Sequence, residues 1–441
     1  MTAAPATPTA APRTVTPTSI TGLGVICSIG QDATSFTAAL REGRCGIVLA
    51  ADPADPDGAT HLAPLGDFDL VDTLDTRAGL PAELRRDALR AARRSPLPVQ
   101  AALAAALEAW QRADLIDRPV ASERIGLIVG GHNLTGRYAF DQYATFQREP
   151  AYLPRRYALH IQDTDHVGTI SQALGIRGEG YTVGASSASG NAALIHAARL
   201  VACGAVDVCL AVGASARLAP PELAALANLG LLAAPGPGIP ADRACRPFDR
   251  ARSGIVPGEA AACVVLESEE SAARRAVPVL ARLAGYAAAL DGNSLSNPDP
   301  LGEARAMRAA LLSAGTAAAA VDYVNAHGTG TPAGDDAELK ALRELFNAGD
   351  PAPWLNSTKA LTGHCLSAAG VLEAVATVAQ IRAGFVHPNP ALTEAAEPGH
   401  RLVGRTASPA RIERALSNSF GFGGFNSSVL ICGPEVPVSA R

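Results

Sequence analysis

The fold is indicated most clearly by the stretch VGASSASGN, residues 183–191 of a 441-residue chain. A short apolar run leads into a turn of small residues, and a helical pattern follows over 191–202. Small residues permit a tight turn and the close approach of a ligand. Ser187 would then lie near a helix N-terminus, where free N–H groups and the helix dipole stabilise negative charge. Serines are also favoured as helix caps, so this stretch alone fits either role.

Around this stretch, apolar runs alternate with helical patterns along the whole chain. Such alternation predicts an α/β protein whose sheets are covered by helices on both faces. The pattern restarts near Glu269, so we expect two duplicated halves, residues 17–268 and 269–433. Strands are expected at 15–23, 125–130, 206–214, 260–267, 278–290, 321–325 and 427–432, and helices at 33–41, 98–113, 191–202, 302–314, 335–345 and 370–383.

The two ends of the chain differ from this body. Residues 1–16 are rich in Ala, Pro and Thr and lack an apolar core, which predicts a disordered leader rather than a signal peptide. Residues 434–441 are expected to form a short tail. The alanine-rich runs are interrupted by charged residues, so we expect no membrane span and a cytoplasmic protein.

Composition excludes several classes of function. A net charge of −5 gives no support for nucleic-acid binding or a polybasic membrane anchor. The eight cysteines form no CxxC pair and mostly lie in apolar runs, which favours reduced thiols over disulfides or a zinc site. Of 37 basic residues only Lys340 and Lys359 are lysines, so each retained lysine is informative.

Two further stretches each contain a histidine in a specific setting. NAHGTGTP, residues 325–332, follows an expected strand, so His327 is well placed to face a cleft. NSTKALTGH, residues 356–364, places Lys359 five residues before His364, and Glu373 follows on the next expected helix. A lone histidine is more often structural and Lys359 could be a surface residue. The flanking small residues and the scarcity of lysine favour a functional role.

A fourth stretch, NSFGFGGFN at residues 418–426, places three glycines among three aromatic residues. It predicts a loop with unusual φ and ψ angles and a movable aromatic side chain. A packed turn is the structural alternative.

Together the four stretches resemble the β-ketoacyl-acyl-carrier-protein synthase (ketosynthase) family. The resemblance covers nearly the whole chain, from ITGLGV at 20–25 to Asn426, and includes RPFD at 246–249 and GE at 258–259. It implies a five-layered αβαβα thiolase fold built from two halves, and normally a homodimer. It also implies an acyl carrier protein as partner, whose phosphopantetheine arm is the only cofactor, and no metal.

The resemblance assigns roles to the basic and acidic residues. His327 and His364 are implied to be the paired active-site imidazoles. Lys359 is implied to hold the network of ion pairs and hydrogen bonds around them, with Glu373 and Glu338 as supporting acids.

It also assigns the remaining candidate residues. The backbone N–H groups of Ser187 and Phe422 correspond to an oxyanion hole, and Phe422 lies on a gating loop. Thr329 and Thr331 match positions that contact the phosphopantetheine arm.

Ser187 departs from the family pattern, because condensing members carry cysteine there. A serine hydroxyl ionises far less readily than a thiol and needs an adjacent base to attack. Loss of CO₂ from a malonyl thioester needs only stabilisation of the enolate oxygen, which two imidazole N–H donors could supply.

The whole stretch 183–191 resembles the Cys-to-Ser ketosynthase-like decarboxylases of polyketide β-branching cassettes. The resemblance implies conversion of malonyl-carrier-protein to acetyl-carrier-protein without condensation. Two alternatives are an inactive partner of a ketosynthase, similar to a chain-length factor, and an acyltransferase or condensing enzyme that uses Ser187 as nucleophile.

An arginine cluster could bind an acidic carrier protein. Its members, if helical, largely share one face. A solvated arginine-rich face explains the pattern equally well. The cluster comprises Arg85, Arg86, Arg90, Arg93 and Arg94.

Overall fold

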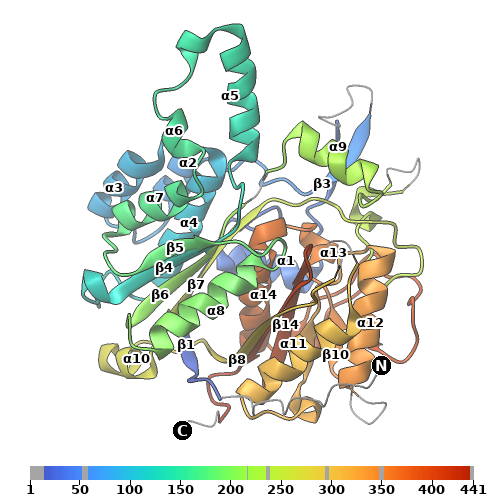
Figure 1. Cartoon of the computed structure of the whole chain (residues 1–441). Coiled ribbons are helices and arrows are strands. Elements are labelled where there is room, and N and C mark those ends of the chain that lie inside the picture. The colour runs from blue at the N-terminus through green and yellow to red at the C-terminus, as the bar shows by residue number, and fades with distance from the viewer. Residues whose placement is uncertain are drawn as a thin grey trace, which may run out of the picture.

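The computed structural model describes residues 14–51, 58–215, 217–234, 239–293, 297–346 and 352–437 (Figure 1). Most of the predicted leader, residues 1–13, and the last residues of the predicted tail, 438–441, lie outside the described residues. The alternation of strands and helices predicted from the sequence is confirmed.

Most strands belong to one large sheet, and two short strand pairs lie outside it. The large sheet contains β1 (Thr18–Cys27), β4 (Ile125–Gly130), β5 (Gly180–Val183), β6 (Val208–Gly213), β7 (Ala260–Glu267), β8 (Ala281–Leu290), β9 (Tyr323–Asn325), β10 (Trp354–Asn356), β12 (Arg401–Leu402), β14 (Arg414–Gly421) and β15 (Phe425–Cys432). The short pairs are β2 (Val48–Ala51) with β3 (Ala59–Leu62), and β11 (Phe385–Val386) with β13 (Ser408–Pro409).

The α-helices fall between these strands. They are α1 (Ala33–Glu42), α2 (Leu70–Thr76), α3 (Ala82–Ala92), α4 (Leu97–Arg112), α5 (Gly136–Arg148), α6 (Tyr157–His160), α7 (Thr164–Leu174), α8 (Ser189–Ala202), α9 (Pro220–Asn228), α10 (Glu269–Arg275), α11 (Pro300–Ser313), α12 (Pro332–Leu345), α13 (Lys359–Thr362) and α14 (Ala369–Ala383).

The order of strands repeats within the sheet. The first half runs β5-β4-β6-β7-β1 and the second runs β10-β9-β14-β15-β8, with β12 added at the edge. In both halves the first three strands are mutually parallel and the last two pairings are antiparallel. The halves meet where residues 18–20 of β1 pair with residues 281–283 of β8. Identical order and direction in both halves indicate an internal duplication.

Three layers of helices alternate with the two halves of the large sheet, which gives five layers in total (Figure 1). On one outer side α4 packs against β1 and β7, and α7 packs against β4 and β5. On the other outer side α11 packs against β8 and β15, with α12 beside it. Between the two halves of the sheet lie α8 and α14, each of which contacts strands from both halves.

The central helix α14 is apolar on every side, as expected of a helix surrounded by protein. Residues 369–380 of it are all buried. The N-termini of α8 and α14 meet at two glycines, because a Cβ on Gly190 would lie 2.8 Å from the backbone N of Gly370. This close approach brings the turn before α8 and the loop before α14 together, and those two segments carry Ser187 and His364.

One prediction about local structure is wrong in part. Residues 418–426 were expected to form a loop, but β14 and β15 stay paired up to Gly421 and Phe425, which leaves a hairpin turn of three residues. Gly423 and Gly424 adopt φ angles of 92° and 71° in that turn. Phe420 and Phe425 continue the strand ladder, because aromatic residues favour strands, whereas Phe422 lies in the turn.

Candidate active site

Ser187 lies in a sharp turn between β5 and α8. Ser186 adopts a φ angle of 51°, which is uncommon for a residue other than glycine. The Ser189 hydroxyl closes the turn, because it accepts from the Ala185 N–H at 2.8 Å and donates to the Ser186 carbonyl at 2.6 Å. Two of the three serines therefore build the turn, and Ser187 is the one whose side chain lines a cavity.

The ring of His364 contacts the hydroxyl of Ser187, with 3.1 Å between Nε2 and Oγ. The other ring nitrogen, Nδ1, accepts a hydrogen bond from the Leu366 N–H at 3.1 Å. A neutral imidazole carries one proton, so Nδ1 is the bare nitrogen and Nε2 carries the hydrogen. His364 therefore donates to Ser187 Oγ and is not available as its base.

The ring of His327 is held in the same protonation pattern by Lys359. The Lys359 Nζ lies 3.4 Å from Nδ1 of His327 and 2.6 Å from its carbonyl oxygen. An ammonium only donates, so Nδ1 accepts and Nε2 carries the proton. The rings of His327 and His364 lie edge to face, with centroids 5.4 Å apart, and both line the cavity. The site thus contains two neutral N–H donors.

Burial keeps both imidazoles uncharged. It lowers the pKa of His327 and of His364 well below the usual range, and the nearby Lys359 ammonium lowers both further. Lys359 pairs with Glu373 at 2.5 Å, and both side chains are 1% exposed. Burial raises the pKa of Glu373 to about 7, because desolvation outweighs the attraction of Lys359. At pH 8, above that value, Glu373 is therefore mainly a carboxylate.

Glu338 fixes the loop that carries His327. Its two carboxylate oxygens accept from the His327 N–H at 2.9 Å and from the Gly328 N–H at 2.7 Å. A third donor, Asn418 Nδ2, lies 3.1 Å from the same carboxylate. Burial raises the pKa of Glu338. Asn418 had no predicted role, and only its place in the fourth stretch could have drawn attention to it.

The cavity that joins these residues has a volume of about 160 Å³. Lys359 and Glu373 lie behind its wall. Seven residues named from the sequence line it: Ser187, His327, Thr329, Thr331, Glu338, His364 and Phe422. Residues that had no predicted role also line it, among them Glu303, Phe420 and Asn426. The four stretches thus converge on one cavity.

Thr329 and Thr331 form one wall, with their hydroxyl oxygens 2.9 Å apart. Thr331 is the N-cap of α12 and accepts from the Gly334 N–H at 3.3 Å. Phe422 lies at the tip of the β14–β15 hairpin and is 48% exposed. Gly421 beside it packs on the serine turn, since a Cβ there would lie 2.6 Å from the Ala185 carbonyl oxygen. The hairpin tip and the Ser187 turn are therefore in contact.

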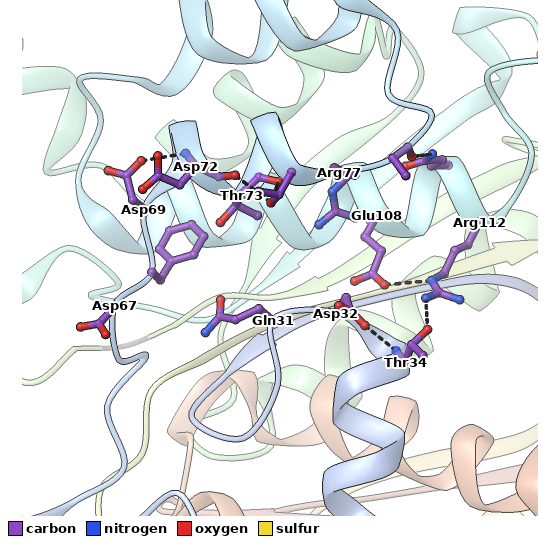
Figure 2. A pocket seen from close by; sticks show the side chains of 14 residues that line it. Gln31, Asp32, Thr34, Asp67, Asp69, Asp72, Thr73, Arg77, Glu108 and Arg112 are labelled. Atoms are coloured by element: carbon purple, nitrogen blue, oxygen red, sulfur yellow. Dashed lines mark hydrogen bonds and ion pairs between the residues drawn. The ribbon is translucent and has the colours of Figure 1, made fainter.

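A larger cavity, of about 700 Å³, lies elsewhere in the first half and is shown in Figure 2. Glu108 on its wall is buried and accepts from Val25 N at 3.0 Å and Ala33 N at 2.8 Å, and it pairs with Arg112. These bonds fasten β1 and α1 to α4. The described residues that line this cavity include no histidine, serine or cysteine. The contacts of Glu108 are thus explained by structure, and the smaller cavity, which is lined by Ser187, His327 and His364, is the candidate site.

The arginine cluster lies on and just after α3, on the outer side of the first half (Figure 1). Three of its five members pair with acids: Arg85 with Asp75, Arg86 with Glu83 and Arg90 with Asp87. The charge available to an acidic partner is therefore smaller than the sequence indicates.

Two further properties of the described residues bear on metal binding and on membrane insertion. Within them, no cluster of three or more His, Cys, Asp and Glu side chains could hold a metal ion. One apolar segment, Leu366–Ala383, is long enough to cross a bilayer, but 78% of it is buried inside the fold. It contains Glu373, and it is the central helix described above.

Comparison with known proteins identifies the family. The family model "Beta-ketoacyl synthase, N-terminal domain" matches residues 16–272, and "Beta-ketoacyl synthase, C-terminal domain" matches residues 280–393. The chain is 38% identical over 426 residues to the polyketide biosynthesis malonyl-ACP decarboxylase PksF of Bacillus subtilis (strain 168), covering 94% of this chain and 97% of that protein. It is 32% identical to 3-oxoacyl-[acyl-carrier-protein] synthase 2 of Vibrio harveyi, covering 93% and 97%.

Solved structures agree with the family models. A β-ketoacyl synthase from Burkholderia phymatum STM815 matches with a TM-score of 0.82 at 28% identity, covering 94% of this chain and 99% of that one. The ishigamide ketosynthase/chain length factor matches with a TM-score of 0.82 at 27% identity, covering 95% and 99%. The thiolase fold predicted from the sequence is confirmed, and the chain belongs to the β-ketoacyl synthase family.

Proposed function

We propose that this protein removes CO₂ from a malonyl group on an acyl carrier protein and releases acetyl-carrier-protein without condensation. The observation that carries the proposal is the hydrogen bond from His364 Nε2–H to Ser187 Oγ. It leaves the serine without a base, while both imidazoles keep an N–H donor at the cavity. The 38% identity to a malonyl-ACP decarboxylase supports the same reaction.

The reaction needs little from Ser187. The bond between C2 and the carboxylate carbon breaks, CO₂ leaves, and the electron pair forms an enolate whose oxygen carries the charge. The Nε2–H of His327, and that of His364 once the substrate oxygen replaces Ser187 Oγ as its acceptor, stabilise that oxygen more than the ground-state carbonyl, which lowers the barrier. The enolate then takes one proton at C2, and the acetyl thioester is complete.

The other residues of the cavity fit a carrier-bound substrate. Thr329 and Thr331 offer hydroxyls to a phosphopantetheine arm, which needs polar partners along an otherwise apolar channel. Phe422 at the exposed hairpin tip gates the entrance. The N–H groups of Ser187 and Phe422 provide a second oxyanion hole where Gly421 packs on the serine turn.

The two alternatives predict different products. A non-catalytic partner, similar to a chain-length factor, has no need of the neutral imidazole pair or of the buried Lys359–Glu373 pair that maintains it. A serine acyltransferase needs a base at Ser187, and His364 is oriented as a donor instead. Neither alternative explains the arrangement of hydrogen bonds as well as decarboxylation does.

Purified protein mixed with malonyl-carrier-protein should yield acetyl-carrier-protein and CO₂ in equal amounts, measured by intact mass and CO₂ release. Heat-inactivated protein gives the background rate. Absence of acetyl product, or formation of an elongated product, would contradict the proposal. A mass increase of an acyl group on Ser187 would favour the acyltransferase.

Substitution of Ser187 separates decarboxylation from acylation. Ser187→Ala should keep the decarboxylation rate within about threefold, because the serine contributes one hydrogen bond to a histidine already fixed by Leu366. Ser187→Cys should gain acylation from an acyl-carrier-protein, because the cysteine thiolate is a far better nucleophile and lies near the α8 N-terminus. Intact mass measures the adduct. A 100-fold loss of acetyl formation in Ser187→Ala would show that the hydroxyl takes part.

The assembly we propose is a homodimer in the cytoplasm that serves a polyketide β-branching cassette. The edge strand β5 has an unpaired side in the described structure. Helix α5 projects away from the body of the molecule (Figure 1), and it carries exposed aromatic side chains. Those side chains are Phe140, Tyr143 and Phe146. A second copy of the chain can cover both, since exposed strand edges and apolar faces favour association.

A further inference from the structure

We propose that Glu303 is the acid that delivers the proton to C2 of the enolate, an inference that rests on the decarboxylation proposed above. An enolate formed by loss of CO₂ either attacks an acyl carbon or is protonated. Decarboxylation without condensation therefore needs a proton donor that a condensing reaction does not need. The family resemblance assigned no residue to this step.

Glu303 lies in the first turn of α11 and lines the same cavity as Ser187, His327 and His364. Its side chain is 1% exposed, and its Oε2 has no hydrogen-bond partner within the described residues. A buried polar atom without a partner is costly and uncommon in native structures. An oxygen left free at the wall of a substrate cavity is placed to bond with the substrate.

The face of α11 that carries Glu303 points toward the active site. Met307, one turn later on the same face, contacts Asn418 Nδ2 at 3.2 Å. Asn418 in turn donates to Glu338, which holds the backbone of His327. A chain of direct contacts thus connects this face of α11 to the catalytic histidine.

The surroundings of Glu303 favour its protonated form. Burial has the largest effect and holds the pKa of this carboxyl well above its usual range, and four acids add to it: Glu338 and Asp335 on α12, Asp291 after β8, and Asp299 at the start of α11. The nearest cation on its own helix, Arg305, is 56% exposed and lies 3.9 Å from Asp291. The other ionisable groups at the cavity, His327 and His364, are neutral.

The proposed step balances in atoms and charge. The Glu303 O–H bond breaks, its proton forms the new C2–H bond, and the enolate electrons return to form the thioester carbonyl. Glu303 is left as a buried carboxylate among other acids, which is unfavourable, so it recovers a proton from solvent before the next turnover. The sum is malonyl thioester anion plus one proton giving acetyl thioester and CO₂.

The test compares Glu303→Gln, which keeps the shape but has no acidic proton, with wild type and with Glu344→Gln, an exposed glutamate on α12 paired with Arg308. Glu303→Gln should lower kcat for acetyl formation about 100-fold with KM within threefold, because general acids typically contribute 10²–10⁴. Glu303→Asp should recover part of the rate. Glu344→Gln should match wild type, and thermal melting should show all variants folded.

The pH profile separates an acid from a structural residue. A general acid must be protonated, so the wild-type rate should be full below the pKa of Glu303 and fall as the pH rises through it. Glu303→Gln should lack this alkaline decline. If Glu303→Gln is slow but keeps the alkaline decline, or if it has the wild-type rate, the role of Glu303 is overturned and the proposed function still stands. A wild-type protein that makes no acetyl product overturns both this role and the proposed function.

Discussion

Replacing His327 or His364 with alanine should lower the rate of acetyl formation about 100- to 1,000-fold, because removal of one preorganised donor from an oxyanion site costs that much. The structure explains why each ring matters. His364 is fixed by Leu366 and His327 by Lys359, and both retain Nε2–H at the cavity. Steady-state rates with malonyl-carrier-protein measure the loss.

Glutamine at the same positions provides the control, since its amide N–H₂ can take the place of Nε2–H. His364→Gln should recover at least tenfold over His364→Ala if the ring acts as a donor. If His364 were instead a base, glutamine would be as inactive as alanine, because an amide does not accept a proton in this range. Wild-type activity should show no histidine titration between pH 6 and 8, since burial holds both pKa values well below 6.5.

Replacing Lys359 with methionine should destabilise the fold by about 3–5 kcal/mol, because it leaves a buried carboxylate without its partner. Lys359 and Glu373 are each 1% exposed and 2.5 Å apart. The measurement is chemical denaturation at pH 8, above the pKa of about 7 that Glu373 has beside Lys359. Without Lys359, which lowers that pKa, the buried carboxyl takes up a proton more readily, and the loss of stability then includes this protonation.

The double variant Lys359→Met, Glu373→Gln separates stability from catalysis. It should regain most of the lost stability, because no unpaired charge stays buried. It should not regain activity, because Nδ1 of His327 still lacks its donor and the ring no longer has a fixed protonation pattern. Recovery of both properties would show that Lys359 serves only the fold. A single variant as stable as wild type would contradict the energetic importance of the pair.

These outcomes would define what the serine has changed. The Ser187 hydroxyl, at the position where condensing relatives carry their nucleophile, accepts a hydrogen bond from His364. His327 and His364, whose N–H groups would stabilise an enolate, both line the cavity. In the function we propose, the serine removes the acylation half of the chemistry and leaves the decarboxylation half, and Glu303 would supply the proton that ends the reaction.

Much of the fold was predictable because its local patterns agree with its tertiary environment. Strands β4 and β7 match the predicted ranges, since continuous apolar runs of that length are typical of strands buried on both faces. Strand β15 was predicted over 427–432, but its tight hairpin with β14 was not, because glycines favour a loop locally and only pairing across the ladder extends the strands. The residue limits of the two halves stay a prediction.

The sequence alone determined the family, the fold class and the identity of the residues around Ser187, because those depend on short motifs of consecutive residues. The tertiary structure decided which ring nitrogen carries each proton, because Leu366 and Lys359 act through space on His364 and His327. It also decided the place of Glu303, which no motif marks. Its position depends on the packing of α11 against the hairpin and α12, and burial among other acids raises the pKa of its carboxyl, as the proposed role of proton donor requires.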